Sequence, residues 1–171
     1  LTAKGYAVMS AVNGEEALLA WCARRLQRPV KWIESRRENL ISTNHGRAQT
    51  DVVRVGATRD GELTALHVRV IADMGAYLQL ITPGIPILGA FLYAGVYDLP
   101  KAYDFSCTGV FTNLTPTDAY RGAGRPEATY AIERSMDALA KQIGIDPLEL
   151  RRRNFIRKDQ FPYEAFTGLV Y

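Results

Sequence analysis

The sequence predicts an α+β fold in which a mixed or antiparallel sheet, containing a β-hairpin, is flanked by helices. Residues 51–58 and 63–72 alternate between apolar and other side chains on either side of a turn. Residues 13–28 and 126–143 instead carry apolar side chains at helical spacing. Strands in the middle of the chain, helices at both ends and few strand–helix–strand units are together typical of α+β proteins.

Composition excludes several classes of protein. The 171 residues are 47% hydrophobic and 23% charged, which predicts an ordinary core and a single domain over residues 1–171. The net charge of +3 is too small to indicate nucleic acid or anionic lipid as a partner. No apolar run reaches the ~18 residues of a membrane span. No signal peptide is recognisable, so a cytoplasmic location is expected.

The first helix is expected after Asn13, whose side chain can form a capping box with Glu16. Apolar side chains at helical spacing continue to Leu26, and Pro29 ends the helix. Residues 30–34 are expected to form a short strand, whereas residues 35–39 give no clear indication.

The hairpin is predicted by two apolar faces and a turn. One face carries Val53, Val55 and Ala57, the other Leu66, Val68 and Val70, and residues 59–62 form the turn. Residues 82–96 are apolar and interrupted by glycine and proline, which predicts one short buried helix. Residues 102–112 are expected to form a further strand.

The last third is predicted to be helical. Pro126 occupies a first-turn position, and Gly144 ends the helix. Its buried stripe is expected to consist of Ile132, Met136, Leu139 and Ile143. A second helix follows, with Asp146 as cap and Glu149 closing a capping box.

One segment, residues 118–128, indicates a candidate ligand-binding site. Gly122 and Gly124 allow a sharp turn just before a helix, where main-chain amides and the helix dipole favour an anionic or oxo ligand. Arg121 and Arg125 add positive charge. The alternative is a glycine turn with solvated arginines, and the motif alone does not exclude it.

Other candidate residues have simpler structural explanations. A loop histidine such as His45, without a carboxylate or cysteine at recognisable spacing, is usually structural. His67 is expected to be exposed on a strand, opposite its apolar face. The basic residues of 151–158 are expected to form a solvated helix face. Cys22 and Cys107 form no metal-binding or disulfide pattern.

Residues 119–128, AYRGAGRPEA, resemble the signature loop of the molybdenum hydroxylases. This family includes xanthine dehydrogenase, aldehyde oxidase and the large subunit of aerobic carbon monoxide dehydrogenase. Further similarities occur in the same order and spacing at residues 15–16, 28–32, 34–38, 45–47, 73–77, 95–100 and 146–154. By this resemblance, the chain is identified as part of the molybdopterin-binding domain of a larger subunit.

The resemblance implies a molybdenum–molybdopterin cofactor, in some members as the cytosine dinucleotide, whose metal is held by the pterin. The loop contacts that fall on Arg121, Gly122 and Ala123 would be made by main-chain amides. The activity implied is hydroxylation of a substrate carbon with oxygen derived from water. The implied partners are the remainder of the large subunit and iron–sulfur and FAD subunits or domains.

Departures from the family pattern restrict the substrate. Gly122 stands where carbon monoxide dehydrogenases carry a copper-binding cysteine, so carbon monoxide oxidation is not expected. Residues 83–96 hold no basic side chain, and Leu88 stands near the substrate-orienting arginine of xanthine enzymes. Ala123 replaces an aromatic residue of many xanthine-type relatives. An aldehyde or an aromatic heterocycle therefore fits best.

The family's general-base glutamate belongs to a far C-terminal segment, and no residue here matches that motif. The isolated chain is therefore expected to be inactive, to lack the cofactor and to self-associate. One alternative is a non-catalytic assembly or interaction module that docks to a separate cofactor-bearing subunit. Nucleic-acid binding through residues 151–158 is less favoured.

Overall fold

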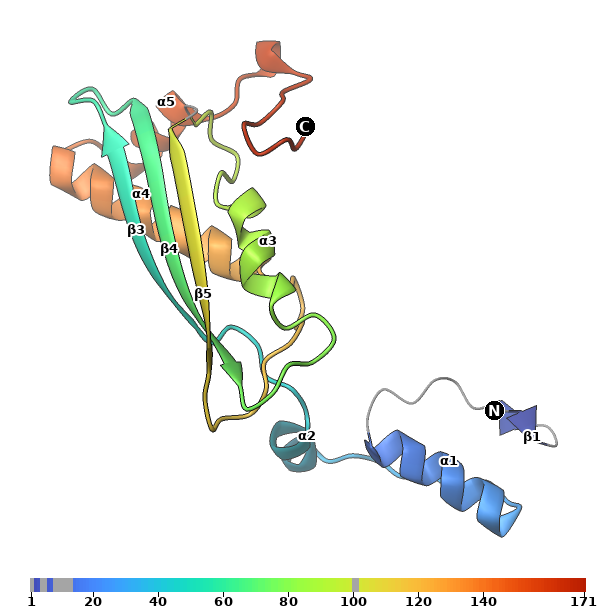
Figure 1. Ribbon diagram of the computed structural model, residues 1–171. Coiled ribbons are helices and arrows are strands. Elements are labelled where there is room, and N and C mark those ends of the chain that lie inside the picture. Colours follow the sequence, from blue (N-terminus) through green and yellow to red (C-terminus); the bar gives the residue numbers. More distant parts are fainter. Residues whose placement is uncertain (1, 4–5, 8–13, 100–101) are drawn as a thin grey trace. The chain divides into compact units, whose positions relative to one another are not determined.

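The computed structural model describes residues 2–3, 6–7, 14–99 and 102–171 (Figure 1). The chain divides into two compact units, residues 1–43 and residues 44–171. That the two units form a single domain stays a prediction. No helix of the described residues is both long enough and apolar enough to cross a membrane.

The described residues of the first unit form two helices and a pair of two-residue strands. Strands β1 (Thr2–Ala3) and β2 (Tyr6–Ala7) pair antiparallel. Helix α1 (Gly14–Leu26) confirms the expected helix, although the capping role of Asn13 lies outside the described residues. Helix α2 (Arg36–Ser42) was not expected.

The strand expected at residues 30–34 is wrong, because these residues have no strand partner in the described part of the unit. Polar side chains at and after residue 34 instead form hydrogen bonds that stabilise the first turn of α2. Ser35 and Glu38 form a capping box, with N–H···O distances of 3.2 and 2.8 Å. The Glu34 carboxylate accepts a hydrogen bond from Asn39 Nδ2 at 2.8 Å.

A three-stranded mixed sheet forms the centre of the second unit. Strands β3 (Gln49–Ala57) and β4 (Leu63–Gly75) are antiparallel, which confirms the hairpin. Strand β5 (Tyr103–Phe111) pairs parallel with β4, so that β4 is central. This arrangement confirms the α+β class and the mixed sheet.

Helices cover one face of this sheet. Figure 1 shows α4 (Arg125–Ile143) lying across that face, with α3 (Gly84–Leu92) on the side of β5. Helix α5 (Pro147–Asn154) and a short 3₁₀ helix (Lys158–Gln160) follow. Helix α3 confirms the short helix expected within residues 82–96, but only one side of it is buried. On the other side, the side chains of Leu88 and Phe91 are 45% and 43% exposed.

The core lies between β4 and α4. Leu66, Val68 and Val70 are buried against the helices, as the alternating pattern predicts. Of the predicted stripe on α4, Ile132 and Met136 are fully buried, whereas Leu139 and Ile143 pack half-buried at its edge. Each fully buried apolar side chain contributes roughly 1.5–3 kcal/mol.

Helix α5 differs from its prediction in two contacts. Asp146 caps the helix by accepting bonds from the amides of Leu148 and Glu149, both at 3.0 Å. The Glu149 carboxylate does not close a capping box; it accepts a bond from Arg153 Nε at 2.9 Å.

The solvated basic face expected at residues 151–158 is wrong for Arg151. Its side chain is only 17% exposed and donates to the carboxylates of Glu133 (2.8 Å) and Asp137 (2.9 Å) on α4. Arg151 therefore joins α5 to α4, and it is not free to contact a phosphate.

Candidate functional site

The glycine-containing loop turns through three successive left-handed residues. The φ angles of Gly122, Ala123 and Gly124 are +97°, +44° and +92°. The Ala123 amide donates to the Tyr120 carbonyl at 2.7 Å, closing the turn. α4, nineteen residues long, begins directly after Gly124.

Two amides of this loop remain available to a ligand. The N–H groups of Arg121 and Gly122 donate to no acceptor in the part of the chain that the structure describes, and both residues are exposed. They lie beside the positive end of the α4 dipole, where main-chain donors favour an anion. The Ala123 amide, also predicted to contact a ligand, is used within the loop.

Both glycines are required, because a Cβ atom at either position would clash with a neighbour and φ is positive at both. A Cβ atom on Gly124 would lie 2.7 Å from the Ile85 carbonyl oxygen at the start of α3. A Cβ atom on Gly122 would lie 2.7 Å from Pro126 Cδ. The loop is thus packed tightly between α3 and the first turn of α4.

A cavity of about 420 Å³ opens between this loop and α3. Gly122, Ala123 and Arg125 line it on one side, and Leu88 on the other. The remaining lining residues are Phe91, Leu92 and Leu169. The fold therefore brings Leu88 and Ala123, which the sequence linked to substrate choice, into one apolar space.

Sequence reasoning missed Phe91 and Leu169 in this cavity. Phe91 lies three residues after Leu88, so it falls on the same side of α3 and helical spacing could have identified it. Leu169 follows the loop by more than forty residues, and no local pattern marks it. Neither Cys22, in α1, nor Cys107, in β5, is among the described lining residues.

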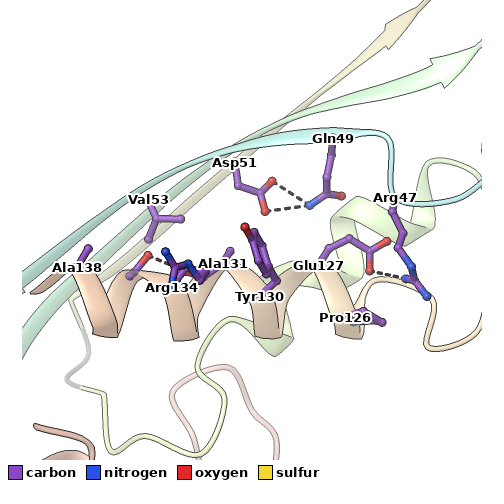
Figure 2. Close-up of a pocket in the computed structure, with 11 residues that line it drawn as sticks. Arg47, Gln49, Asp51, Val53, Pro126, Glu127, Tyr130, Ala131, Arg134 and Ala138 are labelled. Carbon is purple, nitrogen blue, oxygen red and sulfur yellow. Dashed lines mark hydrogen bonds and ion pairs between the residues drawn. The ribbon is translucent and has the colours of Figure 1, made fainter. Parts of the chain in front are cut away.

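A larger cavity of about 750 Å³ lies between β3 and α4 (Figure 2). The Asp51 carboxylate, which lines it, already accepts hydrogen bonds from two neighbouring side chains. Gln49 Nε2 donates to Asp51 Oδ1 at 2.8 Å, and the Tyr93 hydroxyl donates to Asp51 Oδ2 at 2.8 Å. Burial, followed by the bond to Asp51, raises the Tyr93 pKa well above its usual range, so this phenol keeps its proton.

Arg47 links this second cavity to the loop. Its guanidinium donates to Glu127 Oε2 at 3.0 Å and to the Arg121 carbonyl oxygen at 2.5 Å. It also lies over the Tyr120 ring, 5.2 Å from the centroid. His45, two residues before Arg47, forms a β-bridge with Thr117 in the segment that leads into the loop.

The other sequence candidates form no second site. His67 Nδ1 lies 2.6 Å from Asp104 Oδ2 on β5, so it is paired across the sheet and not simply exposed. Burial and the nearby Asp51 raise the pKa of the Cys107 thiol, which disfavours its thiolate. Among the described residues, no cluster of three or more His, Cys, Asp or Glu side chains is arranged to hold a metal ion.

Residues 6–155 match the family described as "Molybdopterin cofactor-binding domain". The chain is 35% identical over 173 residues to the nicotine 6-hydroxylase large subunit of Paenarthrobacter nicotinovorans, covering 99% of this chain and 21% of the relative. It is 43% identical over 149 residues to the carbon monoxide dehydrogenase large chain of Hydrogenophaga pseudoflava, covering 85% and 18%.

A solved structure agrees with these similarities. Quinoline 2-oxidoreductase from Pseudomonas putida 86 superposes with a TM-score of 0.80 at 36% identity, covering 92% of this chain and 20% of that chain. The chain thus spans about a fifth of the length of the relatives that it matches.

Proposed function

Because the chain belongs to the molybdopterin cofactor-binding domain family of the molybdenum hydroxylases, we propose that it forms part of the cofactor-binding subunit of an oxidoreductase that hydroxylates an aldehyde or an aromatic heterocycle with water-derived oxygen. The observation that carries this proposal is the pair of exposed amides at Arg121 and Gly122, which donate to no acceptor among the described residues, in a loop that lines an apolar cavity.

The described residues fit an anionic pterin cofactor. The Arg121 and Gly122 amides belong to exposed residues, donate to no described acceptor and lie next to the N-terminus of α4. The side chains of Arg121 and Arg125 are exposed and form no ion pair among the described residues. Arg121 and Gly122 would contact the cofactor through their amides, and Ala123 through its place in the cavity wall. A cytosine dinucleotide form is part of the proposal.

The cofactor, when bound, supplies the two-electron oxidation of the substrate. The chain's own residues would bind and orient the substrate and exclude water from it. Leu88, Phe91 and Leu92 present an apolar wall that suits a flat or small uncharged molecule. No carboxylate lines this cavity in the described residues, so the proton acceptor would be provided by the rest of the subunit.

Two points narrow the proposed substrate. Gly122 offers no thiolate for copper, which argues against carbon monoxide oxidation despite the similarity to a carbon monoxide dehydrogenase. Leu88, Phe91 and Leu92 place no basic side chain on the α3 side of the cavity, and Arg125 lies on the loop side, which argues against a purine oriented by a cation from α3.

The proposed partners are the remainder of the large subunit and iron–sulfur and FAD subunits or domains that remove the electrons. A cytoplasmic location belongs to the same proposal. A non-catalytic assembly or interaction module that docks to a separate cofactor-bearing subunit is the second candidate.

The 171-residue chain, purified alone, is expected to contain no stoichiometric molybdenum and to oxidise no aldehyde. None of the described residues that line its loop cavity is a carboxylate that could act as the general base. Elemental analysis for molybdenum and an assay with benzaldehyde and a dye acceptor measure this. A stoichiometric molybdenum content would contradict the proposal that the chain needs the remainder of the subunit to hold the cofactor.

Gly122→Ala in the complete polypeptide that contains these residues is expected to lower molybdenum and pterin content about tenfold or more, as loss of a supporting contact does at metal sites. Its Cβ would meet Pro126 and strain the turn at φ +97°. Gly144→Ala is the matched control, because φ is +74° there and a Cβ would meet nothing within 4 Å. Equal molybdenum content in both variants would contradict a role of the loop in binding the cofactor.

A further inference from the structure

We propose that Arg47 is a positioning residue, which holds residues 120–122 so that the amide of Gly122 faces the cofactor. This inference rests on the proposed function of the loop. Neither the loop motif nor helix α4 contains Arg47, which precedes β3 by two residues.

The contacts of Arg47 surround the loop. Its Nη2 donates to the Arg121 carbonyl at 2.5 Å, and its Nη1 donates to Glu127 Oε2 at 3.0 Å. Its guanidinium plane lies over the Tyr120 ring. Figure 2 shows the side chain reaching from the segment before β3 to Glu127 on the first turn of α4. One guanidinium thus contacts residues on both sides of Gly122.

The bond to the Arg121 carbonyl determines where the next amide points. The C=O of Arg121 and the N–H of Gly122 belong to one planar trans peptide, so they point in opposite directions. Fixing the oxygen toward Arg47 therefore directs the Gly122 N–H away from Arg47. That N–H bonds to no described acceptor and is exposed.

Arg47 is itself held firmly enough to fix the loop. The Glu127 side chain is 7% exposed and belongs to a long helix, so this charge-assisted bond has a rigid and largely desolvated anchor. A Cβ atom on Gly46 would lie 3.0 Å from Tyr120 Cβ, so the two segments are in close contact. The carbonyl of His45 accepts the Asp118 amide at 2.9 Å, which fixes the start of the loop.

These contacts require an arginine. A lysine keeps the positive charge and can pair with Glu127, but it has no planar fork to donate to Glu127 and to the Arg121 carbonyl at once. Arg47→Lys therefore keeps the positive charge beside Glu127 but removes the bond that positions the Arg121–Gly122 peptide, so it tests the two effects separately.

The experiment compares Arg47→Lys, Arg134→Lys and Gly122→Ala in the complete polypeptide that contains residues 1–171. Arg134 is the matched control, because it lines the same cavity and pairs with Asp137 but does not contact the loop. Amide hydrogen exchange is followed in peptides covering residues 119–128. Molybdenum and pterin are quantified per polypeptide, and the melting temperature reports global stability.

Arg47→Lys is expected to accelerate exchange of the Ala123 and Arg125 amides about tenfold, since their turn bonds open more often. It is expected to lower cofactor content by a similar factor, as other supporting contacts do. Its melting temperature and the exchange of β4 amides are expected to match those of Arg134→Lys.

Three results would overturn one of the two proposals. Unchanged exchange in the loop of Arg47→Lys overturns the role of Arg47. Faster exchange with full cofactor content, when Gly122→Ala has lost its cofactor, also overturns it. Full cofactor content in Gly122→Ala overturns the proposed function of the loop instead.

Discussion

Asn154→Ala is expected to lower the free energy of unfolding of the chain by about 3 kcal/mol, because it leaves buried polar groups without partners. Asn154 is 5% exposed at the end of α5. Its Oδ1 accepts the Leu63 amide at 2.9 Å, and its Nδ2 donates to the carbonyls of Gly61 and Leu150, both at 2.8 Å. The side chain thereby joins α5 to the turn of the β3–β4 hairpin.

Urea unfolding followed by circular dichroism measures this effect. Asn113→Ala is the control, since Asn113 is exposed and a change there is expected to stay within about 0.5 kcal/mol. Equal unfolding midpoints for the two variants would show that water replaces the lost bonds. Asn154→Asp offers a second comparison, because it retains the acceptor for Leu63 and loses both donated bonds.

The sequence predicted those parts of the fold that depend on local periodicity. The hairpin and the α4 stripe follow from alternating or helical spacing, and Val68 and Met136 are buried as that spacing requires. The parallel pairing of β5 with β4 could not be predicted, because the direction of a strand in a sheet is not encoded in its own alternating pattern. The strand expected at residues 30–34 was wrong because a strand also needs a neighbour.

The loop was identified from its glycines, but what surrounds it was not. Arg47 is 74 residues from Arg121, and nothing in its local pattern indicates that it bonds to that carbonyl. Arg151 lies within a basic run that resembles a solvated face, and only the position of Glu133 and Asp137 on α4 shows that it is paired. Both contacts depend on packing between distant segments.

Gly75→Ala is expected to destabilise the chain by about 3 kcal/mol or more, because it combines overpacking with backbone strain. Gly75 ends β4 with φ +70°. A Cβ atom there would overlap Pro116 Cα and lie 2.5 Å from the Thr115 carbonyl oxygen. Both are main-chain atoms, so no side-chain rotation can relieve the contact.

Gly144→Ala separates the two causes, since its φ is +74° but a Cβ there meets nothing within 4 Å. Strain alone is expected to cost about 1–2 kcal/mol, and the difference between the two variants measures the clash. Gly75 also lies where β4 contacts the segment leading to the loop, because Thr117 Oγ1 donates to the Asp73 carbonyl at 2.8 Å. Displacing residues 115–117 would move the loop at residues 120–124. Gly75→Ala in the complete polypeptide is therefore expected to lower the molybdenum content, whereas Gly144→Ala is expected to leave it unchanged. Equal unfolding midpoints for the two glycine variants would mean that residues 115–116 move aside at little cost, and the segment would then be too compliant to hold the loop in place.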